Sequence, residues 1–186
     1  MTRTKILQII EDGFKGAPYP GDDKLAYRAV VANAACRDEC DYVAAYFKGK
    51  SCKDVTLEDL HAHYEGPITA CLSFMSPEAF RYYLPAFMRM AISEGEWAAD
   101  FAETTTFALT PPHYDPRLEA IPPRETSEAL ARRLEWWKIC VSVFSMAEGK
   151  AILAYLNYLA DQLEGPDREI CFPKEALAYW ADRTGK

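Results

Sequence analysis

Apolar side chains recur every three or four residues along most of the chain, the spacing that places them on one face of an α-helix. Glycine and proline residues, such as Gly66-Pro67, separate the periodic stretches. The pattern predicts helices over residues 3–12, 37–48, about 56–64, 77–93, 96–103 and 174–183, and two more that begin after Thr126 or Ser127 and after Ser145. We therefore expect an all-α fold, a single domain over residues 1–186 built as a bundle of about six to eight helices.

The clearest helix start lies at Ser76. Its hydroxyl can accept a hydrogen bond from a free backbone N–H of the first turn, and Pro77 and Glu78 suit the positions that follow. Pro85 has no N–H to donate to the carbonyl of Arg81, so we expect a bend in this helix. The helix should bury an apolar stripe that consists of Phe80, Tyr83, Leu84, Phe87, Met88 and Ala91.

Two further helix starts show the capping-box pattern, in which a Ser or Thr is followed three residues later by an acidic residue. The two pairs are Thr56 with Asp59 and Ser145 with Glu148. Residues 24–35 fit either a helix or a short strand, and a two-stranded pairing near 27–31 or 105–109 stays open. Five prolines within residues 104–125 predict a long proline-rich loop, and loops of this length are often functional.

The composition suits a folded domain that avoids anionic partners. Hydrophobic residues make up 49% of the 186 positions, ample for a core, and the net charge is −7. Such a surface repels phosphate backbones and anionic lipids, so we expect neither nucleic acid nor a membrane as partner. The first residues lack a signal-peptide pattern, and no stretch approaches the roughly 20 apolar residues of a membrane span. These features favour a cytoplasmic protein.

The residues that could support catalysis or metal binding do not form a recognisable set. His61 and Glu65 are four residues apart, but no third metal ligand is apparent. Cys36 and Cys40 have the same spacing, which lies near the limit of disulfide geometry, and a reducing compartment favours thiols. The chain has no Gly-rich phosphate loop, no His-Glu-x-x-His and no Gly-x-Ser-x-Gly. We therefore expect no cofactor, no metal and no catalytic residue.

Acidic residues gather around one tryptophan. Glu96, Asp100 and Glu103 share a helix face by their spacing, and a cationic partner would relieve the repulsion between them. Trp97 beside them suits an anchoring role at an interface. The alternative is a solvated helix face with Trp97 turned inward. The residues that we expect to bind a partner are Asp22, Asp23, Glu94, Glu96, Trp97 and Asp100.

The run from Phe74 to Phe87 resembles a family of uncharacterised small bacterial proteins. The resemblance covers about residues 13–160 and includes the segments 19–23, 39–40, 47–50, 54–55, 144–145 and 151–156. Cys52 departs from a position where such sequences often have tryptophan. The family has no established catalytic residues, so none is carried over to this chain. Small, acidic, cytosolic proteins of this kind are similar to the immunity partners of secreted toxins.

This resemblance implies a non-catalytic binding protein, an antitoxin-like immunity protein that occludes a basic, cytosol-acting toxin domain. The protein itself would be a monomer or a small homo-oligomer. Two alternatives stay open. One is a small enzyme with a site under the 104–125 loop, where His113 would act as general base and Asp115 would orient it. The other is a structural or regulatory adaptor.

Overall fold

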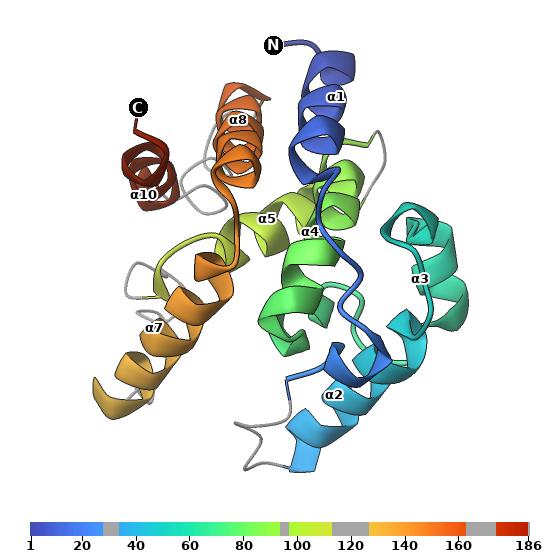
Figure 1. Cartoon of the computed structure of the whole chain (residues 1–186). Helices are drawn as coiled ribbons and strands as arrows, with labels where there is room; N and C mark the ends of the chain where they lie inside the picture. Colours follow the sequence, from blue (N-terminus) through green and yellow to red (C-terminus); the bar gives the residue numbers. More distant parts are fainter. Residues whose placement is uncertain (28–33, 94–96, 113–126, 163–173, 186) are drawn as a thin grey trace. The chain divides into compact units, whose positions relative to one another are not determined.

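The computed structural model describes residues 1–27, 34–93, 97–112, 127–162 and 174–185 (Figure 1). Within these residues the chain forms α1 (Arg3–Phe14), α2 (Ala34–Phe47), α3 (Leu57–His63), α4 (Pro77–Ile92), α5 (Ala98–Ala108), α7 (Ser127–Ser142), α8 (Met146–Gln162) and α10 (Lys174–Thr184). Three short 3₁₀ helices are η1 (Asp22–Lys24), η2 (Cys52–Asp54) and η3 (Cys71–Phe74). The all-α prediction is confirmed, because the only β pairing in the described part of the chain is an isolated bridge between Ala26 and Met75.

The chain divides into two compact units. The central unit is residues 14–105 and contains α2, α3, α4 and most of α5. The terminal unit joins residues 1–13 to residues 106–186, so α1 belongs with α7, α8 and α10. That residues 1–186 act as a single domain stays a prediction.

The start of α4 is as its sequence predicts. The Ser76 hydroxyl accepts a hydrogen bond from the Ala79 N–H at 3.1 Å, and Pro77 is the first helical residue. This satisfies one of the four backbone donors that a helix start leaves without an internal partner. Pro85 lies inside the helix, which continues to Ile92. The bend at Pro85 stays a prediction.

The apolar stripe of α4 forms much of the core of the central unit. All six stripe residues are buried, and Phe80 is only 3% exposed. The ring of Tyr83 packs on Phe47 of α2 with centroids 4.5 Å apart, and Phe87 packs edge-on against Phe101 of α5 at 5.9 Å. These contacts pack α2 and α5 against α4. A helix with a wide apolar face needs such neighbours to bury it.

The flanking helices α2 and α3 also start and stop at recognisable signals. α2 begins at Ala34, three residues before its predicted start, so the helix alternative is correct for the end of the ambiguous 24–35 segment. Gly49 follows α2 with a φ of 65°, a left-handed conformation that glycine adopts readily and that commonly ends helices. Thr56 caps α3, and its hydroxyl accepts from the Asp59 N–H at 3.2 Å.

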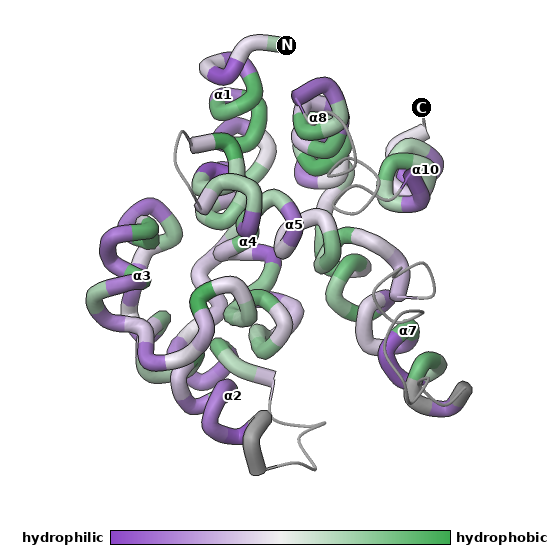
Figure 2. Tube along the Cα trace, turned by 180° about the vertical axis from the view of Figure 1, so that it is seen from behind, coloured by the Kyte–Doolittle hydropathy of each residue, from purple (hydrophilic) through white to green (hydrophobic). Residues whose placement is uncertain are grey.

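The terminal unit confirms the second capping box. The Ser145 N–H donates to the Glu148 carboxylate at 2.6 Å, and the Glu148 N–H donates to the Ser145 hydroxyl at 3.3 Å. Both bonds satisfy backbone or side-chain groups at the start of α8, where Glu148 is buried. α8 is hydrophobic along most of its length, whereas α3 is mainly hydrophilic (Figure 2).

Two glycines let neighbouring helices approach α8 closely. A Cβ atom on Gly13 of α1 would lie 2.5 Å from the Cβ of Ala151, and one on Gly149 would lie 3.2 Å from Thr184 of α10.

Two tryptophans form hydrogen bonds with backbone carbonyls at the end of α5 and just after it. The indole N–H of Trp180 donates to the Leu109 carbonyl at 3.0 Å, and Trp137 donates to the Ala108 carbonyl at the same distance.

The predicted loop over residues 104–125 is wrong at its beginning. α5 runs from Ala98 to Ala108, so residues 104–108 are helical, and the strand alternative at 105–109 is wrong as well. The physical reason is that the buried face of the helix continues, because Phe101, Thr105 and Thr106 are all buried, and the Thr105 hydroxyl is satisfied by donating to the Phe101 carbonyl at 2.7 Å. Pro111 and Pro112 are buried, and the rest of the predicted loop lies outside the described residues.

Candidate functional site

A pocket of about 380 Å³ opens between α2 and α3 in the central unit. Its lining is Tyr42, Ala45, Tyr46, Lys50, Asp59, His63 and Glu65. Aromatic and charged side chains therefore share one concavity, an arrangement typical of sites that orient a ligand through a few polar groups.

Local structure explains why these side chains meet. Tyr42, Ala45 and Tyr46 are three and four residues apart on α2, so they share one face of the helix. The turn at Gly49 then brings Lys50 back beside that face. The Thr56 cap starts α3 and places Asp59 in its first turn, next to the same face.

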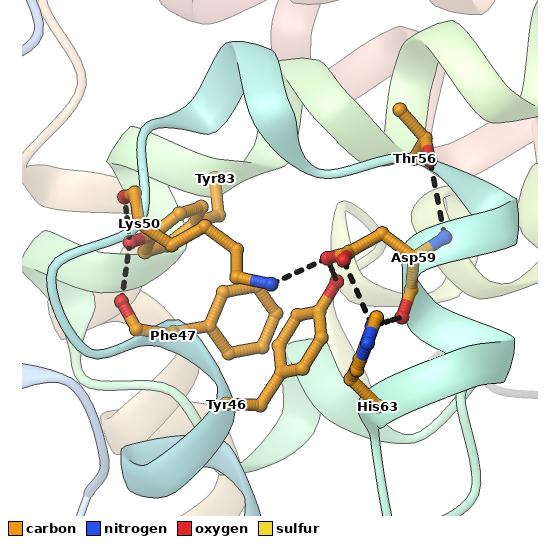
Figure 3. A network of polar contacts seen from close by, with 7 residues as sticks. All are labelled: Tyr46, Phe47, Lys50, Thr56, Asp59, His63 and Tyr83. Carbon is orange, nitrogen blue, oxygen red and sulfur yellow. Dashed lines mark hydrogen bonds and ion pairs between the residues drawn. The ribbon is translucent and has the colours of Figure 1, made fainter.

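The carboxylate of Asp59 lines the pocket and lies at the centre of a network of polar contacts (Figure 3). It accepts hydrogen bonds from the Lys50 ammonium and from the Tyr46 hydroxyl on one oxygen, Oδ2. The other oxygen, Oδ1, lies 3.0 Å from Nδ1 of His63, one turn further along α3. Hydrogen bonds from Lys50, and then from Tyr46, hold the pKa of Asp59 below its usual value. Asp59 is therefore a carboxylate whose oxygens are already engaged.

Lys50 is held from two directions. Its Nζ atom lies 3.9 Å from the centre of the Tyr46 ring, within the range of a cation–π interaction. Its backbone carbonyl accepts a hydrogen bond of 2.7 Å from the buried hydroxyl of Tyr83, which also donates to the Phe47 carbonyl at 3.0 Å (Figure 3). The α2–α3 side of the pocket is thus tied to the core of the central unit.

A second layer of polar groups lies beside the pocket. Gly66 follows Glu65, and a Cβ atom on it would lie 2.8 Å from Oε2 of Glu39 and 3.0 Å from the rings of Tyr42 and Tyr64. Oε2 of Glu39 and the hydroxyl of Tyr64 are buried and make no hydrogen bond within the described residues. Burial, and then the charge of the adjacent Asp38, raise the pKa of Glu39. One carboxyl oxygen of Glu39 therefore lies next to the residue that follows Glu65, without a hydrogen bond among the described residues.

Comparison with known families gives one match over almost the whole chain. The model of a family of unknown function, DUF6714, matches residues 2–184. The chain belongs to this family. No curated protein and no solved structure matches it. The membership agrees with the expected resemblance to an uncharacterised family and extends it beyond residues 13–160.

The predicted partner-binding residues that the structure describes, Asp22, Asp23, Trp97 and Asp100, do not line the pocket. Asp22 accepts hydrogen bonds from the Tyr19 hydroxyl and from the Gly49 N–H, the latter at 3.0 Å, and these bonds lower its pKa. Its carboxylate therefore holds the loop before α2 against the end of that helix. Asp23 and Asp100 are exposed. Glu94 and Glu96 lie outside the described residues.

Trp97 lies at the start of α5 and is only partly buried. Its ring meets the ring of His61 edge-on, with centroids 4.9 Å apart. This contact places Trp97 against α3, the same short helix that contributes Asp59 and His63 to the pocket. The structure thus brings Trp97 next to the pocket helix, and its role as a partner contact stays a prediction.

The histidines and cysteines that were considered for metal binding, disulfide formation or catalysis have different surroundings. His61 contacts Trp97 whereas His63 contacts Asp59, and no group of three metal-ligating side chains occurs among the residues that the structure describes. The buried thiol of Cys40 donates to the Tyr27 carbonyl at 3.3 Å. His113 and Asp115 lie outside the described part of the chain.

Sequence reasoning missed Tyr42, Tyr46 and Lys50 as site residues. The four-residue spacing of the two tyrosines was a usable signal, but it indicates core packing as readily as a pocket wall. The pairing of Lys50 with Asp59 depends on the turn between α2 and α3, which the spacing of charges does not specify.

Among the described residues no single helix is long and apolar enough to cross a membrane, and only the bent pair Leu130–Ser142 with Met146–Gln162 reaches that length and composition.

Proposed function

We propose that the protein is a non-catalytic binding module that occludes a basic protein partner, in the manner of an immunity protein acting on a cytosol-acting toxin domain. The charge distribution supports this proposal. The central unit, residues 14–105, contains 14 acidic and 9 basic residues, whereas the rest of the chain contains 14 and 12. The central unit therefore has a charge of −5 out of the total of −7, which favours and steers a positively charged partner.

The observation that carries the proposal is the pocket between α2 and α3. It combines tyrosine rings with two carboxylates, and its internal cation, Lys50, neutralises only one of them. Tyrosines of this kind anchor many protein interfaces because they bury a large area with few rotatable bonds. On the other side of α3, Trp97 and the exposed Asp100 add a second anchor and a second charge.

The test is capture of a partner by the full chain, followed by measurement of affinity and of inhibition. We expect a stoichiometric complex whose affinity falls as salt rises, and whose formation abolishes the activity of the partner. Asp38→Asn with Glu65→Gln, both in the central unit, should weaken the complex. The control is the pair Glu135→Gln with Asp182→Asn, which makes the same change in charge at exposed residues of the terminal unit. This pair should leave the affinity of the complex unchanged. Equal effects of the two pairs, or no stoichiometric partner, would overturn the proposal.

One observation favours a second candidate, a small enzyme. His63 lines the pocket with its Nδ1 atom 3.0 Å from Asp59, the arrangement in which a carboxylate orients a histidine base. The same Nδ1 atom lies 3.2 Å from the Asp59 carbonyl, which is equally the contact of a histidine at a helix end. A hydrolytic activity that disappears in His63→Gln, with folding unchanged, would favour this candidate over the binding module.

A further inference from the structure

We propose that the pocket receives an arginine side chain of the bound protein, whose guanidinium pairs with Glu65 and stacks on the ring of Tyr42. The inference rests on the proposed function and names the group that the partner inserts. It follows from a difference between the two carboxylates that line the pocket, because one is engaged by neighbouring side chains and the other is not.

Glu65 is the carboxylate of the pocket that is still available. Both oxygens of Asp59 are engaged, one by Lys50 and Tyr46 and the other by His63. Glu65 is exposed and makes no hydrogen bond or ion pair with another described residue. Asp59 and Glu65 bring two negative charges to the lining, and Lys50 brings one positive charge. One more cation would balance it.

Lys50 shows how this lining holds a cation. Its ammonium lies over the face of Tyr46 and pairs with Asp59, so a tyrosine ring and a carboxylate act together. Tyr42 lies one helical turn before Tyr46 on the same face of α2, and Glu65 lies just beyond the end of α3. Both residues line the pocket, and we infer that they act together on a second cation.

Contacts around Gly66 fix the position of this second pair. The Tyr42 ring lies so close to the Gly66 backbone that a Cβ atom there would be 3.0 Å from it, which places the ring beside the residue that follows Glu65. Oε2 of Glu39, buried and without a hydrogen bond among the described residues, lies close to the same backbone position. An aromatic ring and a carboxyl oxygen therefore both lie next to the residue that follows Glu65.

The shape of the site favours arginine over lysine. A guanidinium is planar, so it can stack on a ring while its N–H groups form a fork with a carboxylate. An ammonium, such as that of Lys50, can also contact a ring and a carboxylate, but it does so as a point charge and cannot form the two parallel hydrogen bonds of a guanidinium. A pocket of about 380 Å³ is also within the usual size range for a bound group larger than a single ion.

The test uses acetyl-arginine-methylamide as the probe and acetyl-citrulline-methylamide as its neutral counterpart, titrated into the full chain by amide NMR. We expect saturable shifts at Tyr42, Ala45 and Glu65 with the arginine probe only. Glu65→Gln should weaken binding by about tenfold or more, the size expected for loss of a charge-assisted hydrogen bond. Asp54→Asn, a change at an exposed acidic residue of the same unit outside the pocket, should leave binding of the probe unchanged.

Equal binding of the citrulline probe, or shifts that do not saturate or that Glu65→Gln leaves unaltered, would overturn the inference. The affinity of a captured partner separates this failure from failure of the proposed function. If the partner binds wild type and Glu65→Gln equally well, the arginine pocket is wrong and the binding module stands. If no partner exists, the function is wrong while the probe titration still decides the pocket.

Discussion

Replacing Gly13 by alanine places a methyl group into the contact between α1 and α8. The new Cβ atom would lie 2.5 Å from the Cβ of Ala151, 3.9 Å from its Cα and 3.4 Å from the Ala147 carbonyl. Carbon atoms in good contact are about 3.5–4.0 Å apart, so the helices must separate by about 1 Å or more. Overpacking of this kind costs about 1–3 kcal/mol.

The helix preference of alanine over glycine offsets part of this cost, by about 0.5–1 kcal/mol. We therefore expect Gly13→Ala to lower the free energy of unfolding by about 1–2 kcal/mol. Ala151→Gly alone should also destabilise, because it puts glycine in α8 and removes a buried methyl group. The double variant moves the methyl from one helix to the other. Its stability should return to within about 1 kcal/mol of wild type, a coupling that shows direct contact.

The assay is urea unfolding followed by tryptophan fluorescence in a Trp97→Phe background. The three remaining tryptophans, Trp136, Trp137 and Trp180, all belong to the terminal unit, so the signal reports on the unit that contains the contact. Lys5→Ala is the control, since this residue lies on α1 in the same unit and is exposed. Purely additive losses in the double variant, or a Gly13→Ala protein as stable as wild type, would refute the packing of α1 on α8.

Three other changes test the central unit and the second helix cap. Phe80→Ala should lower stability by about 3–5 kcal/mol, because the ring is almost fully buried; a loss below about 1 kcal/mol in chemical denaturation would contradict that burial. Asp59→Asn should flatten the fall in stability on acidification. The pKa of Asp59 in the folded protein lies below its usual value of 3.8. The ionised carboxylate therefore adds its full share to the free energy of unfolding above pH 3.8, and this share is lost as the pH falls through the pKa of the folded state. An unchanged slope below about pH 5 in denaturation curves would contradict the network around Asp59. Ser145→Ala removes a cap and should cost about 1 kcal/mol, read as a lower urea midpoint at constant slope.

The sequence predicted helix starts better than it predicted the site. The caps at Ser76, Thr56 and Ser145 are local, because a hydroxyl and an N–H three residues away decide them, and all three are present. α5 extends further than expected because Thr105 and Thr106 continue its buried face. Threonine is more often exposed than buried, so the local pattern does not predict this burial.

The site could not be predicted because its contacts are set by tertiary structure. The pairing of Lys50 with Asp59 requires the turn after Gly49 and the cap at Thr56 to act together. The expected cluster around Trp97 rests on charge spacing alone and stays a prediction, whereas the contact of Trp97 with His61, a residue 36 positions earlier in the chain, was not expected. Spacing along one helix cannot reveal such a neighbour from another.

The division of the chain also has a consequence for synthesis on the ribosome. The central unit is one continuous segment, so it can fold as soon as about residue 105 has emerged. α1 is made first, but its partner α8 begins only at Met146, so α1 waits with its apolar face uncovered while some 130 further residues are added. At about 5–20 residues per second this interval lasts roughly ten seconds. A nascent chain stalled within it would present α1 to chaperones, whereas the pocket between α2 and α3 could already have formed.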